Sequence, residues 1–134
     1  MALVIDASAL VVALLGRSAE AAVLRRRLVA ETCHAPHLID AEVGNVLRRQ
    51  VLRGELSAAD AQVLLSSSEP LVDHRHQMTG ALARAAWELR DNVTFYDGLY
   101  VALAAALTLP LVTADQRLSH APRLGCVIEH VAVA

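Results

Sequence analysis

Short, almost wholly apolar runs alternate along this chain with amphipathic segments of helical length. The apolar runs are residues 2–6 (ALVID), 32–36 (TCHAP), 70–74 (PLVDH), 110–115 (PLVTAD) and 125–131 (GCVIEHV). Strands that are apolar on both faces are typical of parallel sheets, which helices cover on both sides. The alternation therefore predicts an α/β fold with three layers (α/β/α), a central parallel sheet of four to five short strands, and a single domain over residues 1–134.

Helix signals occupy the segments between these runs. Ser8 is placed to cap the first helix and Gly16 to end it, and the spacing from Ser57 to Asp60 is a capping pattern. Pro70 stands at the first position of the third strand, where proline is tolerated. The expected helices span residues 8–16, 18–29, 37–54, 57–68, 77–91 and 94–108.

Charge and cysteine content exclude several classes of protein. The net charge of −2 argues against a general nucleic-acid coat, and all 12 basic residues are arginine. Cys33 and Cys126 lie far apart, so neither a disulfide framework nor a cysteine zinc site is indicated. The longest uncharged stretch, residues 98–114, is shorter than the roughly 20 residues of a membrane span. We therefore expect a cytoplasmic protein that does not associate with membranes.

Acidic residues end the two most uniformly apolar strands. Asp6 ends the first strand, and Asp115 ends the fourth, two residues after Thr113. In an open parallel sheet, ligands bind beyond the carboxyl ends of the strands. The two carboxylates are therefore expected to face the same crevice.

Two further acids lie on predicted helices. Glu42, Asn45 and Arg49 are spaced i, i+3, i+7 and line one polar face of their helix. Asp97 lies near the start of a helix that is otherwise uncharged. Each acid also has a simpler interpretation, because Asp97 suits a helix first turn, Asp115 suits a helix cap, and a lone Glu42 is usually solvated.

A convergence of these acids would require a cation. Two like charges about 4 Å apart repel by roughly 4 kcal/mol at an effective dielectric near 20, so such a cluster takes up protons or binds a metal ion. Oxygen ligands without thiolate or imidazole select Mg²⁺ or Mn²⁺. A carboxylate-held Mg²⁺ is suited to phosphodiester hydrolysis, in which the metal activates water and offsets charge on the phosphate.

Four stretches carry a family resemblance: LVIDASALVVALL, APHLIDAEVGNVLRR, FYDGLYVALAAAL and LPLVTADQRL. The chain resembles the PIN-domain ribonucleases and, more closely, the VapC-type toxins of bacterial toxin–antitoxin pairs. The resemblance implies a PIN-like fold and a Mg²⁺-dependent endoribonuclease, with RNA as its substrate and Mn²⁺ as a substitute metal. It also implies a homodimer and a cognate antitoxin that obstructs the active site.

The same resemblance assigns roles to individual residues. It places the acidic quartet on Asp6, Glu42, Asp97 and Asp115, with Asp6 and Asp97 as the principal metal ligands. By the same matching, three polar residues would orient those carboxylates: Ser8, Asn45 and Thr113. The sequence departs from the family pattern at Gly98, where alanine is more usual, and in the absence of an acid from residues 116–120. The number of metal ions is therefore left open.

Contacts to RNA are less well specified. Arginines flank the proposed site in sequence and suit RNA phosphates: Arg17, Arg48, Arg49 and Arg117. Four aromatic residues could stack on bases, but core or dimer packing fits them better: Trp87, Phe95, Tyr96 and Tyr100.

Four other functions deserve comparison. A response-regulator receiver relies on a lysine, which this chain does not have, and no glycine-rich phosphate loop supports a nucleotide-binding module. A histidine metal site, from His34 with His37 or His74 with His76, has no suitable third ligand, so satisfied or exposed histidines are expected. The remaining alternative is a catalytically silent PIN-like module that binds an antitoxin or RNA without cleaving it.

Overall fold

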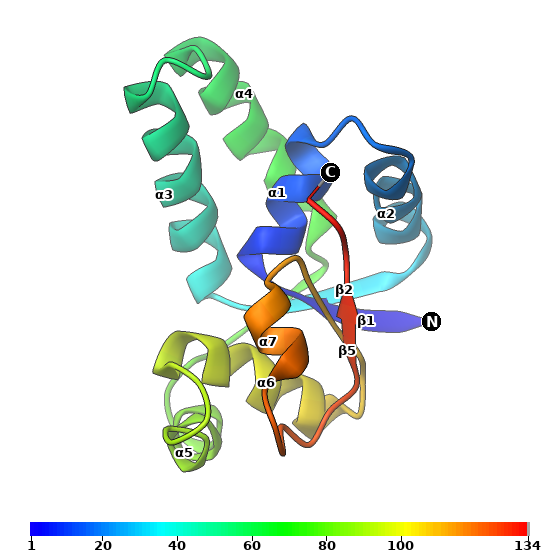
Figure 1. Ribbon diagram of the computed structural model, residues 1–134, viewed down its shortest axis with the longest axis vertical. Helices are drawn as coiled ribbons and strands as arrows, with labels where there is room; N and C mark the ends of the chain where they lie inside the picture. Colours follow the sequence, from blue (N-terminus) through cyan, green and yellow to red (C-terminus); the bar gives the residue numbers. More distant parts are fainter. Residues whose placement is uncertain (134) are drawn as a thin grey trace.

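The computed structural model describes residues 1–133, and its strands and helices alternate along the chain as the sequence pattern predicts (Figure 1). The strands are β1 (Ala2–Ile5), β2 (Thr32–Pro36), β3 (His74–His76), β4 (Leu111–Thr113) and β5 (Ile128–His130). The helices are α1 (Ala7–Leu15), α2 (Ala19–Ala30), α3 (Leu38–Leu52), α4 (Ala58–Ser68), α5 (Ala81–Glu88), α6 (Phe95–Leu107) and α7 (Gln116–His120). A 3-10 turn (Glu69–Leu71) joins α4 to β3.

The five strands form one parallel sheet in the order β3-β2-β1-β4-β5. Helices α1 to α4 lie on one side of the sheet, and α5 and α6 lie on the other (Figure 1). This arrangement confirms the α/β class with a helix-covered parallel sheet. Strands β1 and β4 are neighbours, with Ile5 opposite Val112, so their carboxyl ends open onto the same edge.

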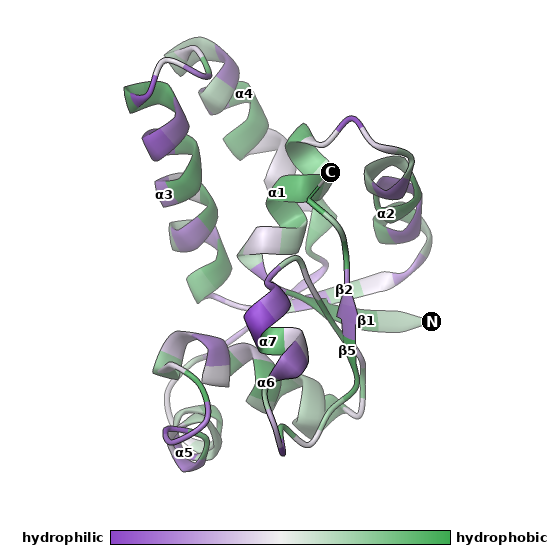
Figure 2. Cartoon of the chain, in the orientation of Figure 1, coloured by the Kyte–Doolittle hydropathy of each residue, from purple (hydrophilic) through white to green (hydrophobic). Residues whose placement is uncertain are grey.

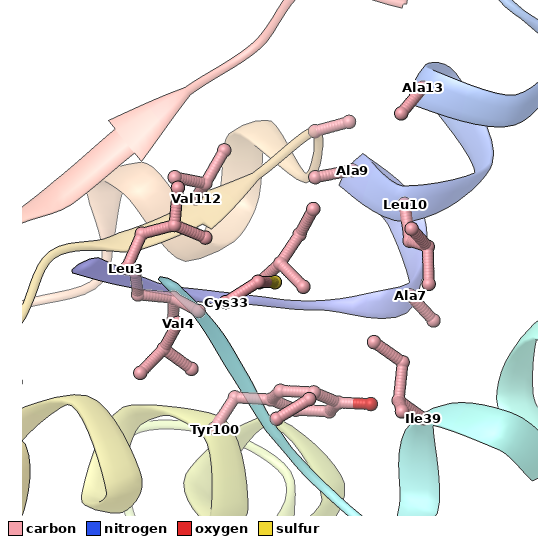
Figure 3. Close-up of a cluster of buried hydrophobic side chains, with 14 of the residues drawn as sticks. Leu3, Val4, Ala7, Ala9, Leu10, Ala13, Cys33, Ile39, Tyr100 and Val112 are labelled. Carbon is pink, nitrogen blue, oxygen red and sulfur yellow. The ribbon is translucent and has the colours of Figure 1, made fainter. Parts of the chain in front are cut away.

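The core lies on both faces of β1. Leu3, Val4 and Ile5 are fully buried, and Figure 3 shows Leu10 of α1 on one side of this strand and Tyr100 of α6 on the other. Each such side chain contributes roughly 1.5–3 kcal/mol by its removal from water. Hydrophobic colouring follows β1 and α1, whereas hydrophilic residues gather on α3 and α7 (Figure 2). Burial on both sides explains why the strand is uniformly apolar.

The third strand and the helix that follows it both begin later than predicted. The third strand begins at His74, not at residue 70, because Pro70 lies in the first turn of the 3-10 segment. Proline lacks an N–H donor, which suits a first helical turn better than a sheet ladder. The helix expected over residues 77–91 begins only at Ala81, after Gly80, whose φ of +74° favours glycine.

The start of α1 and the end of β4 also differ from the prediction. Asp6, not Ser8, is the N-cap of α1, because the Asp6 carboxylate accepts a hydrogen bond from the Ala9 N–H. Gly16 follows the last residue of α1 as predicted. After β4 the chain forms the short helix α7 with Asp115 as its N-cap, which agrees with the simpler interpretation of that residue.

Residues 1–133 contain no single helix that is both long and apolar enough to cross a membrane. Among these residues, α1 and α2 are long and apolar enough only when they are taken together, and the chain bends by 109° between them.

Candidate functional site

All four predicted acidic residues line one pocket of about 370 Å³, which we call the acidic pocket. Asp6 follows β1, Glu42 lies in α3, Asp97 lies in the first turn of α6, and Asp115 follows β4. The parallel sheet explains part of this convergence, since the carboxyl ends of β1 and β4 are adjacent. Residues separated by more than a hundred positions in sequence therefore share one cavity.

Asp6 is the most buried of the four acids, with 6% of its surface exposed. Its carboxylate accepts hydrogen bonds from the Ser8 hydroxyl at 2.7 Å, the Ala9 N–H at 2.9 Å and the Thr113 hydroxyl. Burial nevertheless raises the pKa of Asp6, because desolvation outweighs these three donors. Ser8 and Thr113, which the resemblance had assigned as orienting residues, thus contact the carboxylate directly.

The hydroxyls of Ser8 and Thr113 are themselves held by the backbone after β4. The Ala114 N–H donates to Ser8 Oγ at 2.9 Å, and the Asp115 N–H donates to Thr113 Oγ1 at 3.0 Å. Each hydroxyl therefore accepts a hydrogen bond from a backbone N–H after β4 and donates one to the Asp6 carboxylate. These contacts leave the carboxylate little freedom to rotate.

Glu42 is held by a residue that the sequence had not placed in the site. The Tyr100 hydroxyl donates to Glu42 Oε1 at 2.5 Å. Burial raises the pKa of Glu42, the Tyr100 hydroxyl acts against that rise, and the nearby charges of Asp6 and Asp97 add to it. Tyr100 lies three residues after Asp97, so both face the same side of α6. That spacing is the sequence signal that could have identified Tyr100.

Asp97 and Asp115 each combine a place in the pocket with a structural role at a helix N-terminus. The Asp97 N–H donates to the Thr94 hydroxyl, which caps α6, and burial followed by the charge of Asp115 raises the pKa of Asp97. Asp115 caps α7, accepting from the Arg117 N–H at 2.9 Å, and forms an ion pair with the Arg117 guanidinium at 3.3 Å. The simpler interpretations of these two acids therefore hold alongside their shared cavity.

The remaining predicted polar residues are placed less tightly. Asn45 lines the acidic pocket, but it is exposed, and no hydrogen bond among residues 1–133 joins it to a carboxylate. Arg49 and Arg117 also line this pocket. Arg17 lines a neighbouring groove, and Arg48 is exposed on α3 outside the lining of the acidic pocket.

The donor set of the pocket fits a hard divalent cation. Its ionisable ligands are carboxylates, without histidine or cysteine, and three of them have raised pKa values that a bound cation would lower again. Within the described chain, no three His, Cys, Asp or Glu side chains are gathered closely enough to enclose an ion. Mg²⁺ is typically held by one or two carboxylates and retains waters, so a cation bound here would not need an enclosing cage of protein ligands.

The four histidines of the alternative metal site lie elsewhere, on or beside β2 and β3. His34 Nδ1 and His76 Nε2 are 2.9 Å apart, the His74 ring stacks on His34, and His37 is exposed. His34 and His76 therefore satisfy each other, and His37 and His74 are exposed, as expected for these four residues.

The aromatic residues only partly follow their prediction. Tyr100 is buried in the core, with 1% of its surface exposed. Trp87, Phe95 and Tyr96 are 57%, 42% and 61% exposed, so these three do not pack in the core, and dimer packing stays the prediction for them. Their exposure next to the start of α6 leaves them accessible to a ligand or a partner.

The chain is similar to known proteins over nearly its whole length. The family described as PIN domain matches residues 3–124. Ribonuclease VapC1 of Mycobacterium tuberculosis is 51% identical over 128 residues, which cover 96% of either sequence. Ribonuclease VapC9 of the same species is 42% identical over 126 residues, covering 94% of this chain and 95% of that protein.

Solved structures match the fold over nearly the whole chain. VapBC2 from Rickettsia felis, bound to a DNA fragment from its promoter, has a TM-score of 0.71 at 15% identity and covers 97% of this chain and 98% of that chain. VapBC-5, a member of the VapBC toxin–antitoxin family from Mycobacterium tuberculosis, has a TM-score of 0.60 at 21% identity and covers 98% of both chains. At these identities the likeness shows the fold alone.

Proposed function

This chain belongs to the PIN-domain family and, within it, to the VapC ribonucleases of toxin–antitoxin systems, and from that premise we propose that it is a Mg²⁺-dependent endoribonuclease that cuts RNA at the acidic pocket. Asp6, Glu42, Asp97 and Asp115 would hold the metal ion, with Mn²⁺ as a substitute. The observation that carries the proposal is the convergence of these four carboxylates, from four separate elements, on one cavity.

The burial of the acids supports a cationic ligand. Asp6, Glu42 and Asp97 all have raised pKa values, so their ionised forms are less favourable here than in water. Mutual repulsion contributes to each of these shifts, since each acid feels the charge of at least one other. A fold that gathers carboxylates whose ionised forms are unfavourable is typical of a binding or catalytic site.

The chain's own residues fix the geometry of the reaction. When bound, a divalent ion would polarise a water molecule and offset the negative charge that develops on the attacked phosphate. Ser8 and Thr113 hold the Asp6 carboxylate in one orientation, and Tyr100 does the same for Glu42. Arg49 and Arg117 line the same pocket and supply charge-assisted contacts to phosphate oxygens.

Cleavage by antitoxin-free protein tests this proposal. We expect the purified chain to cut single-stranded RNA with Mg²⁺ or Mn²⁺, to lose activity in EDTA, and to leave products with a 5′-phosphate and a 3′-hydroxyl. Because the attacking group is water, the 2′-hydroxyl of the RNA is not required. Products ending in a 2′,3′-cyclic phosphate would contradict the mechanism, and RNA binding without cleavage would favour the catalytically silent alternative.

We further propose an antitoxin partner and a homodimer. VapBC-5 from Mycobacterium tuberculosis, which shares the fold, is a member of the VapBC family of toxin–antitoxin systems. Next to the acidic pocket, a groove of about 550 Å³ between α1 and α3 is lined by apolar side chains that include Val11, Leu15 and Val46. We call it the apolar groove, and an antitoxin segment lying in it would reach the acidic pocket, with which it shares Ser8 and Val46. Co-expression of the chain with its cognate antitoxin should give a complex without nuclease activity, and light scattering of the free chain should give a dimer mass.

A further inference from the structure

A second polar cavity, of about 460 Å³, opens beside the acidic pocket, and we call it the side pocket. It is formed by the loop between α5 and α6 (residues 90–94) and by α7. Asp97, Asp115 and Arg117 line both cavities, so these three residues form a shared wall. A polymer with one phosphate in the acidic pocket can therefore extend directly into the side pocket.

The residues of the side pocket suit a nucleotide. Arg90 and Arg117 provide two guanidinium groups for phosphates, and the Asn92 amide provides both a donor and an acceptor for the edge of a base. Leu118 and Ala121 give an apolar surface on which a base or ribose can lie. The volume falls within the range of roughly 300–1,000 Å³ that small-molecule sites occupy.

The apolar groove on the other side of the acidic pocket is less suited to RNA. Its lining is dominated by aliphatic side chains such as Val11, Val12 and Leu15, with Arg17 as its cation. RNA carries one phosphate per nucleotide and needs cationic and hydrogen-bonding partners along its length. Of the two cavities that adjoin the acidic pocket, the side pocket is therefore the better path for the RNA strand.

Arg90 is positioned at the side pocket without being neutralised. Its guanidinium lies 5.1 Å from the centroid of the Trp87 ring, and Nη1 donates to the Trp87 carbonyl at 3.1 Å. None of the ion pairs among residues 1–133 involves Arg90. Arg117 contacts Asp115 through Nη2 at 3.3 Å and Nε at 3.4 Å, both long for charge-assisted hydrogen bonds, and its side chain is 92% exposed, so it can turn toward a phosphate. Both cations are thus available to a ligand.

Resting on the proposed nuclease function, we propose that the side pocket binds the nucleotide adjacent to the phosphate that is cut. Arg90 and Arg117 contact the phosphates of the strand, and Asn92 contacts the edge of the base. The side pocket then contributes to which RNA sequence the enzyme prefers, because Asn92 discriminates among bases whereas the arginines do not.

Binding of a short RNA tests this assignment separately from cleavage. The probe is a fluorescently labelled single-stranded RNA of mixed sequence, titrated with full-length protein in Mg²⁺ in the Asp6→Asn background, which we expect to leave the RNA intact. Arg90→Ala should weaken binding about tenfold, as expected for one charge-assisted contact, and should reduce the slope of log affinity against log salt by about 0.7. Arg84→Ala is the matched control, since Arg84 is exposed like Arg90 but lies in α5, outside the side pocket.

The base contact is tested with RNAs that differ at a single position. Asn92→Ala should reduce the preference among such RNAs about tenfold, the lower part of the range for a base-edge contact, while changing the salt dependence little. Cleavage maps of the parent and of Asn92→Ala should differ in the positions that are cut. A structural effect alone would lower all binding together and would not change these preferences.

Each outcome decides between the two proposals. If the parent cuts RNA while Arg90→Ala and Asn92→Ala bind and cut like Arg84→Ala, the side pocket is not the nucleotide site, and the proposed function stands. If the parent does not cut RNA, the proposed function fails, and the binding series in the same proteins still decides whether the side pocket holds RNA. If Arg90→Ala instead changes the oligomeric mass seen by light scattering, the side pocket belongs to an interface between copies, and the assignment is overturned.

Discussion

Removal of the Tyr100 hydroxyl is the most direct test of how the acidic pocket is held together. Tyr100→Phe keeps the buried ring and deletes only the 2.5 Å hydrogen bond to Glu42. A hydrogen bond to a charged group contributes about 1.5–3 kcal/mol, and we take about 1.5 kcal/mol because Glu42 is only half-buried. For a chain of this length that loss lowers the melting temperature by about 5 °C. RNA cleavage should fall at least tenfold, because Glu42 loses the group that orients it.

The loss of stability in Tyr100→Phe depends on pH, and the direction of this dependence follows from the raised pKa of Glu42. Burial raises this pKa above 4.5, so the folded chain holds the proton more tightly than the unfolded chain. The stability that the group contributes is therefore present below pH 4.5 and is lost as the pH rises through the folded pKa. The Tyr100 hydroxyl favours the carboxylate, so its removal raises the pKa further and increases that loss. The difference between parent and variant should be small near pH 4 and reach its full size near pH 7.

Urea unfolding of the metal-free chain in EDTA at the two pH values measures this difference. The matched control is Tyr96→Phe, which deletes the same hydroxyl from a neighbouring residue of α6 that is 61% exposed. Tyr96→Phe should change the free energy of unfolding by less than about 0.5 kcal/mol at either pH. The reasoning is refuted if the two variants are equally stable at pH 7, or if the loss in Tyr100→Phe is the same at both pH values.

Three further changes test other parts of the fold and site. Asp6→Asn should abolish cleavage without lowering stability at pH 7. Because the pKa of Asp6 is raised, the parent loses stability as the pH rises above 3.8, and urea unfolding from pH 4 to 8 should show that this loss is absent from the variant. Gly98→Ala should raise the free energy of unfolding by much less than the roughly 1 kcal/mol of helix propensity, because the new Cβ would lie 3.1 Å from the Ala86 carbonyl oxygen. Calorimetry that shows the full gain would contradict this close packing of α5 on α6. Arg75→Ala should lower the free energy of unfolding in urea by about 1–2 kcal/mol, because Arg75 of β3 donates to the Asp40 carboxylate of α3 through Nε at 2.7 Å and Nη2 at 2.9 Å. Cleavage should be retained, since both residues lie outside the acidic pocket. A loss of activity larger than the loss of folded protein would contradict this separation.

The sequence was sufficient for the features that depend on patterns. Uniformly apolar strands between helical segments predicted the parallel sheet, and the rule that ligands bind at the carboxyl ends of such strands brought Asp6 and Asp115 together. Asp97 and Glu42 lie on helices, and their spacing alone does not predict that they reach the same site. The family resemblance was needed as well to place them there. What each of these acids does in the reaction stays a prediction that cleavage assays must test.

Features that depend on a single contact could not be predicted in the same way. Pro70 suits the start of a strand and the start of a helix equally well, because its missing N–H is tolerated at both. Only the sheet pairing, which begins with His34 opposite His74, shows that the strand starts after Pro70. Tyr100 stands in a run of apolar residues, so only the position of Glu42 across the pocket shows that its hydroxyl has a partner. Asn45 has the expected spacing, yet helical periodicity places a residue on a face without fixing what its side chain contacts.

The capping roles of the acids explain how the fold tolerates the pocket but not how the pocket is neutralised. Asp6 and Asp115 are N-caps, and Asp97 lies in a first turn, so each faces the positive end of a helix dipole. Such a position stabilises a carboxylate by about 0.3–1 kcal/mol. The raised pKa of Asp97, to which the charge of Asp115 contributes, shows that repulsion and burial prevail over the caps. Helix termini therefore place these acids, and the charge that remains is what a divalent ion would balance.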